Sequence, residues 1–275
     1  MKSSAPKSAN SAVKVIDLFC GIGGLSYGFS LSGFDVVAGF DSDPSCKFSY
    51  EKNCRGIFVE KDLSDKAVAK EIKKLFQDAK IRVLIGCAPC QPYSVYNNKL
   101  QKGTSVDTKW QLLFNFVEII KKTKPHIISM ENVPQLLRFK NGEIFHDFKS
   151  RLEQLGYNVT HFIVDAKDYG VPQRRKRLVV FGSKFGSIGI VNKTVKNNKY
   201  RVVRDVIGGL PPIEGGPGHP HDPLHRARKL SPMNLRRIRA TPEGGFWRDW
   251  AEELKLECHK KEEGICFRSV YGRMR

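Results

Sequence analysis

Residues 14–29 read KVIDLFCGIGGLSYGF and predict a short buried strand, a glycine-rich turn and the start of a helix. The apolar run at 14–19 has the length of a strand. Gly21, Gly23 and Gly24 allow the backbone to bend sharply and to approach a ligand closely. Backbone amides at a helix N-terminus can also donate hydrogen bonds to an anionic group. The stretch therefore predicts the first strand–turn–helix unit of a ligand-binding α/β sheet.

Strands and helices continue to alternate for about 170 residues after this turn. The pattern predicts an α/β domain with a doubly wound, mainly parallel sheet. Such sheets bind ligands outside the carboxyl ends of their strands, so we expect the chemical residues there. Strands are expected at 14–19, 35–41, 82–86, 126–130 and 177–183, and helices at 25–33, 67–76, 112–120 and 145–156.

The amino-acid composition of the chain changes near residue 186. The stretch GGLPPIEGGPGHPHDP is too rich in glycine and proline for a long regular element. Between Lys193 and Arg239 the sequence has eleven Lys or Arg residues and only three Asp or Glu residues. We expect a flexible leader at 1–12, a catalytic domain at 13–185 and a smaller, loop-rich basic region at 186–275.

The bulk composition points to a polyanionic partner. The 275 residues include 47 Lys or Arg against 28 Asp or Glu, a net charge of +19, which favours nucleic acid. No apolar run predicts a membrane span or a secretory signal. Seven scattered cysteines suit reduced thiols. We therefore expect a cytoplasmic protein, in bacterial cytosol or nucleoid, that takes no membrane partner.

The stretch GCAPCQPYS, residues 86–94, places a cysteine directly after a predicted strand. Pro89 fixes the backbone before Cys90 and aims its thiol out of the strand end. A lone C-x-x-C with Cys87 is also typical of redox pairs and half zinc sites. A zinc site needs two more ligands, and Cys258, His259 and Cys266 are irregularly spaced. We therefore predict no metal, and Cys87 as a small core residue.

The glycine-rich turn and the acids after the next strands favour a nucleoside-containing ligand. Ser26 stands where a dinucleotide fingerprint has glycine, so NAD is disfavoured. Asp41 lies 22 positions after Phe19 at the end of the second predicted strand, where an acid holds ribose hydroxyls. Asp62 is a further candidate contact.

Four motifs stand in a characteristic order: DLFCGIGGLSYGF at 17–29, GCAPCQPYS at 86–94, ENVPQLL at 131–137 and DYGVPQRRKRLVVFGS at 168–183. Together they resemble the cytosine-5 DNA methyltransferases over residues 14 to about 185. The resemblance implies a Rossmann-like fold and methyl transfer from S-adenosylmethionine to carbon 5 of cytosine, as in restriction–modification systems. The product would be S-adenosylhomocysteine.

The resemblance also implies a cofactor site. Phe19 would pack on the adenine, Asp41 would hold the ribose, and Asp62 the adenine amino group. The family's position after the ribose acid is often bulky, whereas this chain has Ser42. The complete expected set is Asp17, Phe19, Gly21, Gly23, Gly24, Asp41, Asp62 and Pro89.

The reaction itself explains the expected catalytic residues. Carbon 5 of cytosine is a poor nucleophile, and a thiolate added at carbon 6 makes it reactive. We predict Cys90 as this nucleophile, with Glu131 hydrogen-bonding or protonating ring nitrogen 3. In the QRRKR run at 173–177, Arg175 and Arg177 would share one face if the segment is extended and would fix the cytosine, as in the family.

The target base must leave the duplex to reach the thiol. The polar loop from Tyr93 to about Thr108 is expected to close over it. Phe246, Trp247 and Trp250 are expected in a core, and the alternative is that they act as wedges in a DNA groove. The expected DNA contacts are Gln91, Ser94, Asn97, Arg174, Arg228, Arg236 and Arg237, with arginine to guanine the commonest specific pairing.

The chain stops at Arg275 without the family's C-terminal motifs. It is therefore expected to be one part of a split enzyme completed by a second polypeptide, or a truncated product. Two other functions are alternatives. One is a tRNA cytosine-5 methyltransferase of the same fold. Cys266-Phe267 matches a fragment of that group's sequence signature, but the next residue, Arg268, does not match it. The other is a catalytically silent DNA-binding subunit.

Overall fold

The computed structural model describes residues 12–89, 111–196, 199–213, 216, 218–222, 225–243 and 245–260. The chain forms two compact units. The first contains the described residues up to Val164 and the segment Lys176–Val191, and the second contains Asp165–Arg175 and the described residues from Asn192 onward. The expected boundary near residue 186 stays a prediction.

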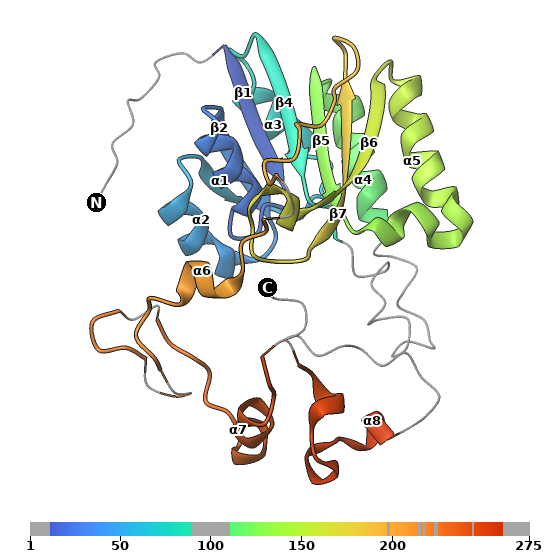
Figure 1. The fold of residues 1–275 in the computed structure, drawn as a ribbon. Coiled ribbons are helices and arrows are strands. Elements are labelled where there is room, and N and C mark those ends of the chain that lie inside the picture. Colours follow the sequence, from blue (N-terminus) through green and yellow to red (C-terminus); the bar gives the residue numbers. More distant parts are fainter. Residues whose placement is uncertain are drawn as a thin grey trace. The chain divides into compact units, whose positions relative to one another are not determined.

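The first unit is built around one seven-stranded sheet with the order β3-β2-β1-β4-β5-β7-β6 (Figure 1). Parallel pairing joins β1 to β2 and β4, β2 to β3, and β4 to β5, while β7 is antiparallel to β5. The mainly parallel sheet is thus confirmed. The strands are β1 (Val13–Leu18), β2 (Asp35–Asp41), β3 (Ile57–Glu60), β4 (Ile81–Gly86), β5 (Ile127–Asn132), β6 (Asn158–Asp165) and β7 (Lys176–Ser183).

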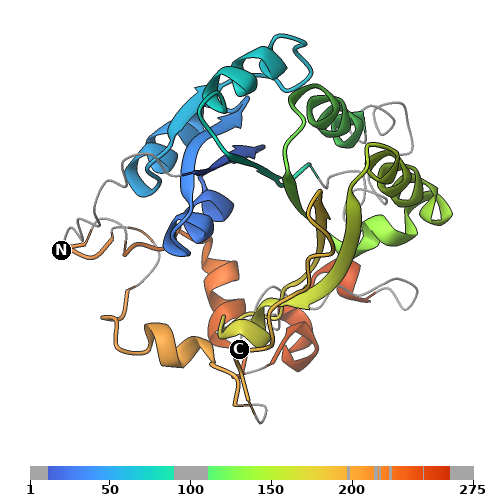
Figure 2. The same ribbon diagram turned by 90° about the horizontal axis from the view of Figure 1, so that it is seen from above.

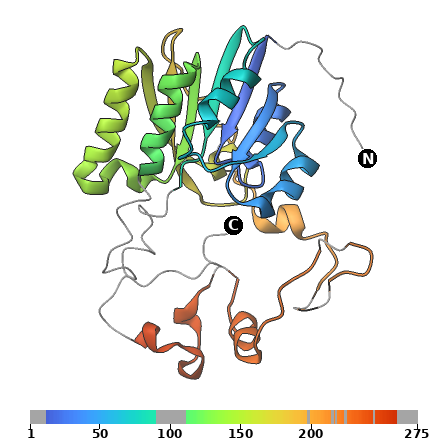
Figure 3. The same cartoon turned by 180° about the vertical axis from the view of Figure 1, so that it is seen from behind.

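Helices cover both faces of this sheet. Along one face lie α3 (Val68–Leu75), α4 (Gln111–Thr123) and α5 (Glu143–Gln154), as the views from above and behind show (Figures 2 and 3). Their apolar sides pack with Ile16, Phe40 and Leu84 in the main core. On the other face, α1 (Gly24–Leu31) packs Leu25 and Phe29 against a second core. This is the doubly wound arrangement expected from the sequence.

Two strands and one α-helix of the first unit were not predicted from the sequence. β3 has only four residues, and α2 (Lys47–Asn53) only seven. β6 has no buried residue. Short or half-exposed elements carry little hydrophobic periodicity, because burial is what imposes it.

The second unit has short elements: α6 (Val203–Ile207), α7 (Pro232–Arg239) and α8 (Glu257–Lys260). Trp247, Trp250 and Leu254 form a small core of their own, which confirms the expected burial of both tryptophans. Across the described residues of the chain, no helix is long and apolar enough to cross a membrane.

Candidate active site

A cavity of about 330 Å³ lies where the parallel strands end. β1 has β2 on one side and β4 on the other, so the strand order reverses at β1, where such sheets bind ligands. Residues following four successive strands meet there. The described lining is Phe19, Asp41, Ser42, Lys61, Asp62, Leu63, Cys87, Pro89 and Leu112. Phe19, Asp41, Asp62 and Pro89 were all expected at this site.

The turn after β1 is fixed to the end of β2. The Gly21 amide donates a 2.8 Å hydrogen bond to Asp41 Oδ2, and the Asp43 amide donates to Asp41 Oδ1 at 3.0 Å. Phe19 has a φ of 58°, and Gly21 one of 51°. A left-handed phenylalanine costs about 1–3 kcal/mol, a strain typical of functional sites. The turn thus holds the Phe19 ring and the Asp41 carboxylate on one cavity wall.

The cavity fits an adenosyl group. Phe19, Leu63, Pro89 and Leu112 supply apolar surface, and Asp41 keeps lone pairs free for ribose hydroxyls because a carboxylate has about four acceptor sites. The Ser64 amide donates to Asp62 Oδ1 at 2.8 Å and lowers the pKa of that carboxyl. Asp62 therefore stays ionised and accepts hydrogen bonds, as an amino group requires.

Four expected cofactor contacts are not on the described cavity wall: Asp17, Gly21, Gly23 and Gly24. Asp17 is fully buried beneath the turn, where Ser26 Oγ donates to Asp17 Oδ2 at 2.7 Å. Asp17 is therefore not part of the described cavity wall, and its expected contact with the cofactor stays a prediction. The reason is strand alternation, since Ile16 and Leu18 face the main core and Asp17 faces α1.

Asp17 predicts a pH dependence of stability. Burial raises its pKa from 3.8 to about 7, so the folded protein keeps a proton that the unfolded chain releases above about pH 4. Because the unfolded state then binds fewer protons, the free energy of unfolding falls as the pH rises from about 4 to 7. The fall is roughly 4 kcal/mol at most, at about 1.36 kcal/mol per pKa unit.

Urea unfolding of the wild type and Asp17→Asn at several pH values measures this effect. Asp17→Asn should flatten the fall, because the amide does not titrate in this range. The exposed Asp78 is the matched control, and Asp78→Asn should retain the wild-type slope. An unchanged slope in Asp17→Asn would contradict the assignment.

The expected acid and one of the two arginines meet at the end of β5. Glu131 Oε1 lies 2.5 Å from Arg177 Nε, and both side chains are largely buried. Antiparallel pairing of β5 with β7 opposes Glu131 to Val179 and Asn132 to Leu178, which brings the start of β7 to the carboxyl end of β5. The ion pair fixes the orientation of the carboxylate.

Asn132, the next residue, connects β5 to the segment that follows β4. Its Nδ2 donates a buried 3.1 Å hydrogen bond to the Ala88 carbonyl, and its Oδ1 accepts from the Val133 amide. The sequence prediction did not single out Asn132 as a site residue, although its position beside Glu131 and before Pro134 was the available signal. Ala88 and Pro89 immediately precede Cys90, which lies outside the described residues, as do Gln91, Ser94, Asn97 and the expected closing loop.

Replacing Asn132 by alanine tests this connection. The change leaves the buried Ala88 carbonyl without its donor, so we expect a loss of about 1–3 kcal/mol in the free energy of unfolding. The methyl transfer expected from the sequence should fall as well, at a temperature where the variant is folded, because the backbone before the expected nucleophile Cys90 loses its anchor. Asn53→Ala, at an exposed amide in α2, should change neither quantity appreciably; equal effects of the two variants would contradict the account.

Cys87 is not the core residue expected from the sequence. It is only partly buried and lines the cavity, because β4 has ended at Gly86. Desolvation and the nearby Glu131 carboxylate raise the pKa of its thiol strongly, so Cys87 stays a neutral, weakly reactive thiol. Among the described residues no group of three or more His, Cys, Asp or Glu side chains has metal-binding geometry.

The other expected arginines lie outside β7 or in the second unit. Arg174 and Arg175 are exposed just before β7, and the Arg175 amide donates to Asp165 Oδ1 at 3.1 Å. Arg237 donates to the Leu254 carbonyl at 2.7 Å and to Asn234 at 2.9 Å. Its guanidinium thus stabilises the fold of α7, while Arg228 and Arg236 are exposed. The DNA contacts expected of Arg174, Arg228, Arg236 and Arg237 stay predictions, as does the expected contact of Arg175 with the cytosine.

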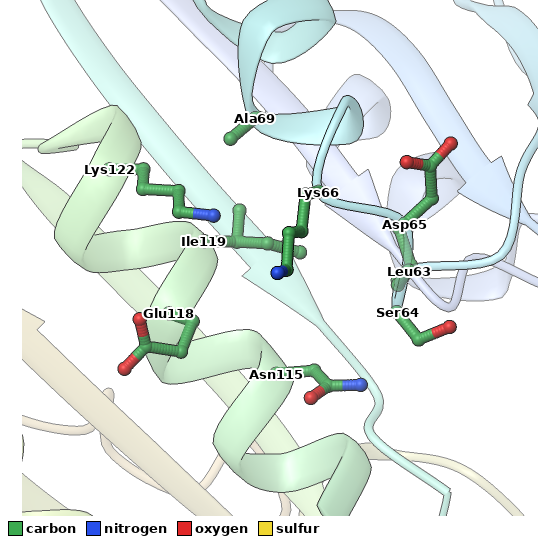
Figure 4. A pocket seen from close by; sticks show the side chains of 9 residues that line it. All are labelled: Leu63, Ser64, Asp65, Lys66, Ala69, Asn115, Glu118, Ile119 and Lys122. Carbon is green, nitrogen blue, oxygen red and sulfur yellow. The ribbon is translucent and has the colours of Figure 1, made fainter.

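A second hollow of about 190 Å³ lies between the start of α3 and α4 (Figure 4). It shares Leu63 with the cavity. Its charges are balanced, with Lys66 and Lys122 against Asp65 and Glu118, so it offers no net attraction to an anion or a cation. The cavity at the strand ends is therefore the better candidate for a cofactor.

Comparison with known families gives one match over most of the chain. The family model described as C-5 cytosine-specific DNA methylase matches residues 13–245. The Type II methylase M.HgiDII of Herpetosiphon aurantiacus is 50% identical over 260 residues, which cover 94% of this chain and 72% of that protein. The Type II methyltransferase M1.HphI of Haemophilus parahaemolyticus is 30% identical, with coverages of 94% and 71%.

Solved structures agree with the fold. A DNA modification methyltransferase encoded within an E. coli prophage superposes with a TM-score of 0.60 at 27% identity, covering 76% of this chain and 58% of that chain. The Dnmt2 methyltransferase of S. pombe gives a TM-score of 0.53 at 21% identity, with coverages of 70% and 58%. The chain therefore spans less than two thirds of either solved protein.

Proposed function

The chain belongs to the C-5 cytosine-specific DNA methylase family, and from this premise we propose that it methylates carbon 5 of a flipped-out cytosine in a specific duplex sequence, with S-adenosylmethionine as methyl donor. The names of its relatives support a role in a Type II restriction–modification system. The observation that carries the proposal is the joint placement of Glu131 with Arg177 and of Asn132 with Ala88 beside the nucleoside-sized cavity.

The cofactor site would use the cavity residues. Asp41 would accept hydrogen bonds from the ribose hydroxyls, Asp62 from the adenine amino group, and Phe19 would pack on the adenine ring. S-adenosylmethionine would supply an electrophilic methyl group. The chain's task is to hold the adenosyl group at the strand ends and to exclude water from the cavity.

The base would be activated by the chain's own residues. The Cys90 thiolate would add to carbon 6 of the cytosine, and the electron pair of the 5,6 double bond would move toward ring nitrogen 3. Glu131, oriented by Arg177, would hydrogen-bond or protonate that nitrogen. Carbon 5 would then take the methyl group and lose its proton to a base. The released electron pair would reform the 5,6 double bond and expel the thiolate from carbon 6, and nitrogen 3 would return any proton it had taken to Glu131, which restores the aromatic ring.

Product analysis tests the proposal. The chain, purified together with any partner that co-expression supplies, is incubated with S-adenosylmethionine and either unmethylated duplex DNA or unmodified tRNA, and the digested nucleosides are analysed by mass spectrometry. We expect 5-methyldeoxycytidine from the duplex only. Product from tRNA alone, or cofactor binding without any methylated product, would contradict it; these two results correspond to the tRNA enzyme and the silent subunit.

A second polypeptide stays a prediction from the sequence. Co-expression with the genes that flank this one, followed by purification on the tagged chain, tests it. A partner that co-purifies and raises the specific methylation activity is expected. If the chain purified alone has the same specific activity as the co-purified complex, a second polypeptide is not required.

A further inference from the structure

Tyr50, a residue of α2, fills the space behind the cofactor turn. Its side chain is fully buried. A Cβ added to Gly39 in β2 would lie 2.4 Å from the Tyr50 ring, and one added to Gly23 in the turn would lie 2.9 Å from it. Real side chains do not approach so closely, so the ring occupies the room left by both glycines. Tyr50 therefore packs against the turn and against β2 at the same time.

The Tyr50 hydroxyl begins a buried chain of hydrogen bonds. It lies 3.1 Å from Ser26 Oγ, and Ser26 Oγ lies 2.7 Å from Asp17 Oδ2. The single hydroxyl proton of Ser26 goes to Asp17, so Tyr50 is the donor to Ser26. Ser26 and Asp17 are fully buried as well. The chain of bonds therefore links α2 to α1 and α1 to β1.

This link fixes the geometry of the cavity wall. The turn between β1 and α1 carries Phe19, which lines the cavity, and Gly21, whose amide donates to Asp41. Asp17 precedes the turn and Ser26 follows it, so the bond between them closes the turn at its base. Cys54, which directly follows α2, donates from its thiol to the Gly23 carbonyl at 3.4 Å, which adds a second support from the same side.

We propose that Tyr50 is a positioning residue for cofactor binding: acting through Ser26 and Asp17, it holds the glycine-rich turn so that Phe19 and Asp41 face the adenosyl group. The inference rests on the proposed function, because it takes S-adenosylmethionine as the ligand of the cavity. It also gives Asp17 a role behind the turn, apart from the direct cofactor contact expected from the sequence.

Tyr50→Phe is the sharpest test, since it keeps the ring and removes only the hydroxyl. Calorimetric titration with S-adenosylhomocysteine should show a Kd raised about tenfold, equivalent to ~1.4 kcal/mol. The KM for S-adenosylmethionine should rise by a similar factor while kcat stays near the wild-type value. Hydrogen exchange should be faster in the turn at residues 19–24.

Tyr157→Phe is the matched control. Tyr157 is also buried in the first unit, and its hydroxyl donates to the Pro125 carbonyl at 2.6 Å. Its loss should lower stability without changing the Kd. A loss of stability alone in Tyr50→Phe, with an unchanged Kd, would therefore overturn the proposal.

A double-mutant cycle tests the order of the hydrogen bonds from Tyr50 through Ser26 to Asp17. If Tyr50 acts through Ser26, Tyr50→Phe should change the Kd little in a Ser26→Ala background, because the path is already broken. Additive effects on the Kd would contradict this path. A wild-type chain that binds S-adenosylhomocysteine but leaves cytosine unmethylated would contradict the proposed function alone. A wild-type chain that does not bind S-adenosylhomocysteine would overturn the proposed function and the role of Tyr50 together.

Discussion

Cys90→Ser is expected to lower the rate of methyl transfer by roughly a thousandfold or more, the scale typical of losing a nucleophile. A free thiol is a few per cent ionised at neutral pH, whereas a serine hydroxyl is not ionised measurably, so carbon 6 of the base loses its attacking group. Single-turnover methylation of a cognate duplex measures the loss. DNA affinity should remain close to that of the wild type, because the side chain changes by one atom.

Cys46→Ser controls for the change of sulfur to oxygen. Cys46 is a partly exposed cysteine between β2 and α2 and is not part of the described cavity wall. This variant should retain most of the wild-type rate. Comparable rates in Cys90→Ser and the wild type would remove Cys90 from the reaction.

Glu131→Gln is expected to lower the single-turnover rate by about 10²–10⁴-fold, the range for a lost acid–base group. The amide has the same shape but cannot supply a proton to ring nitrogen 3, and it no longer forms an ion pair with Arg177 at 2.5 Å. The Kd for S-adenosylhomocysteine should stay near the wild-type value because Glu131 is not on the described wall of the cavity.

Glu118→Gln is the matched control for charge. Glu118 is exposed on α4, so the variant should methylate DNA at the wild-type rate. A Glu131→Gln rate within a few-fold of wild type would show that the carboxyl has no part in the chemical step.

The parts of the fold that the sequence predicted are those with strong burial. The strand at 35–41 was placed at its observed bounds, because Val36, Ala38 and Phe40 are buried in it. β6 was missed because its eight residues are exposed or only partly buried. α2 was missed because its seven residues include a single buried one, Tyr50. That one residue nevertheless packs against Gly23 and Gly39.

The sequence predicted the part of the candidate site that lies at the ends of strands. Phe19, Asp41, Asp62 and Pro89 line the cavity because they lie at or just after the ends of strands whose carboxyl ends share one edge. The placement of Asp17 needed the side of the strand on which it lies, and the Asn132 bond needed the register between β4 and β5. Strand alternation puts Asp17 on the opposite face from Ile16 and Leu18, but which face α1 covers depends on the packing of the sheet. The Asn132 bond joins residues 44 positions apart, which local patterns do not contain.

Trapping on 5-fluorocytosine tests the central claim, a transient bond between Cys90 and carbon 6 of cytosine. Fluorine at carbon 5 cannot leave as the proton does, so the methylated adduct cannot expel the thiolate. The wild-type chain is incubated with S-adenosylmethionine and a cognate duplex that carries the fluorinated base. Protease digestion and mass spectrometry then locate any nucleotide attached to the protein.

We predict a denaturant-resistant adduct that requires S-adenosylmethionine and maps to the peptide containing Cys90. A chain that methylates the unmodified duplex but forms no adduct with the fluorinated one, or forms it through Cys87, would contradict the mechanism.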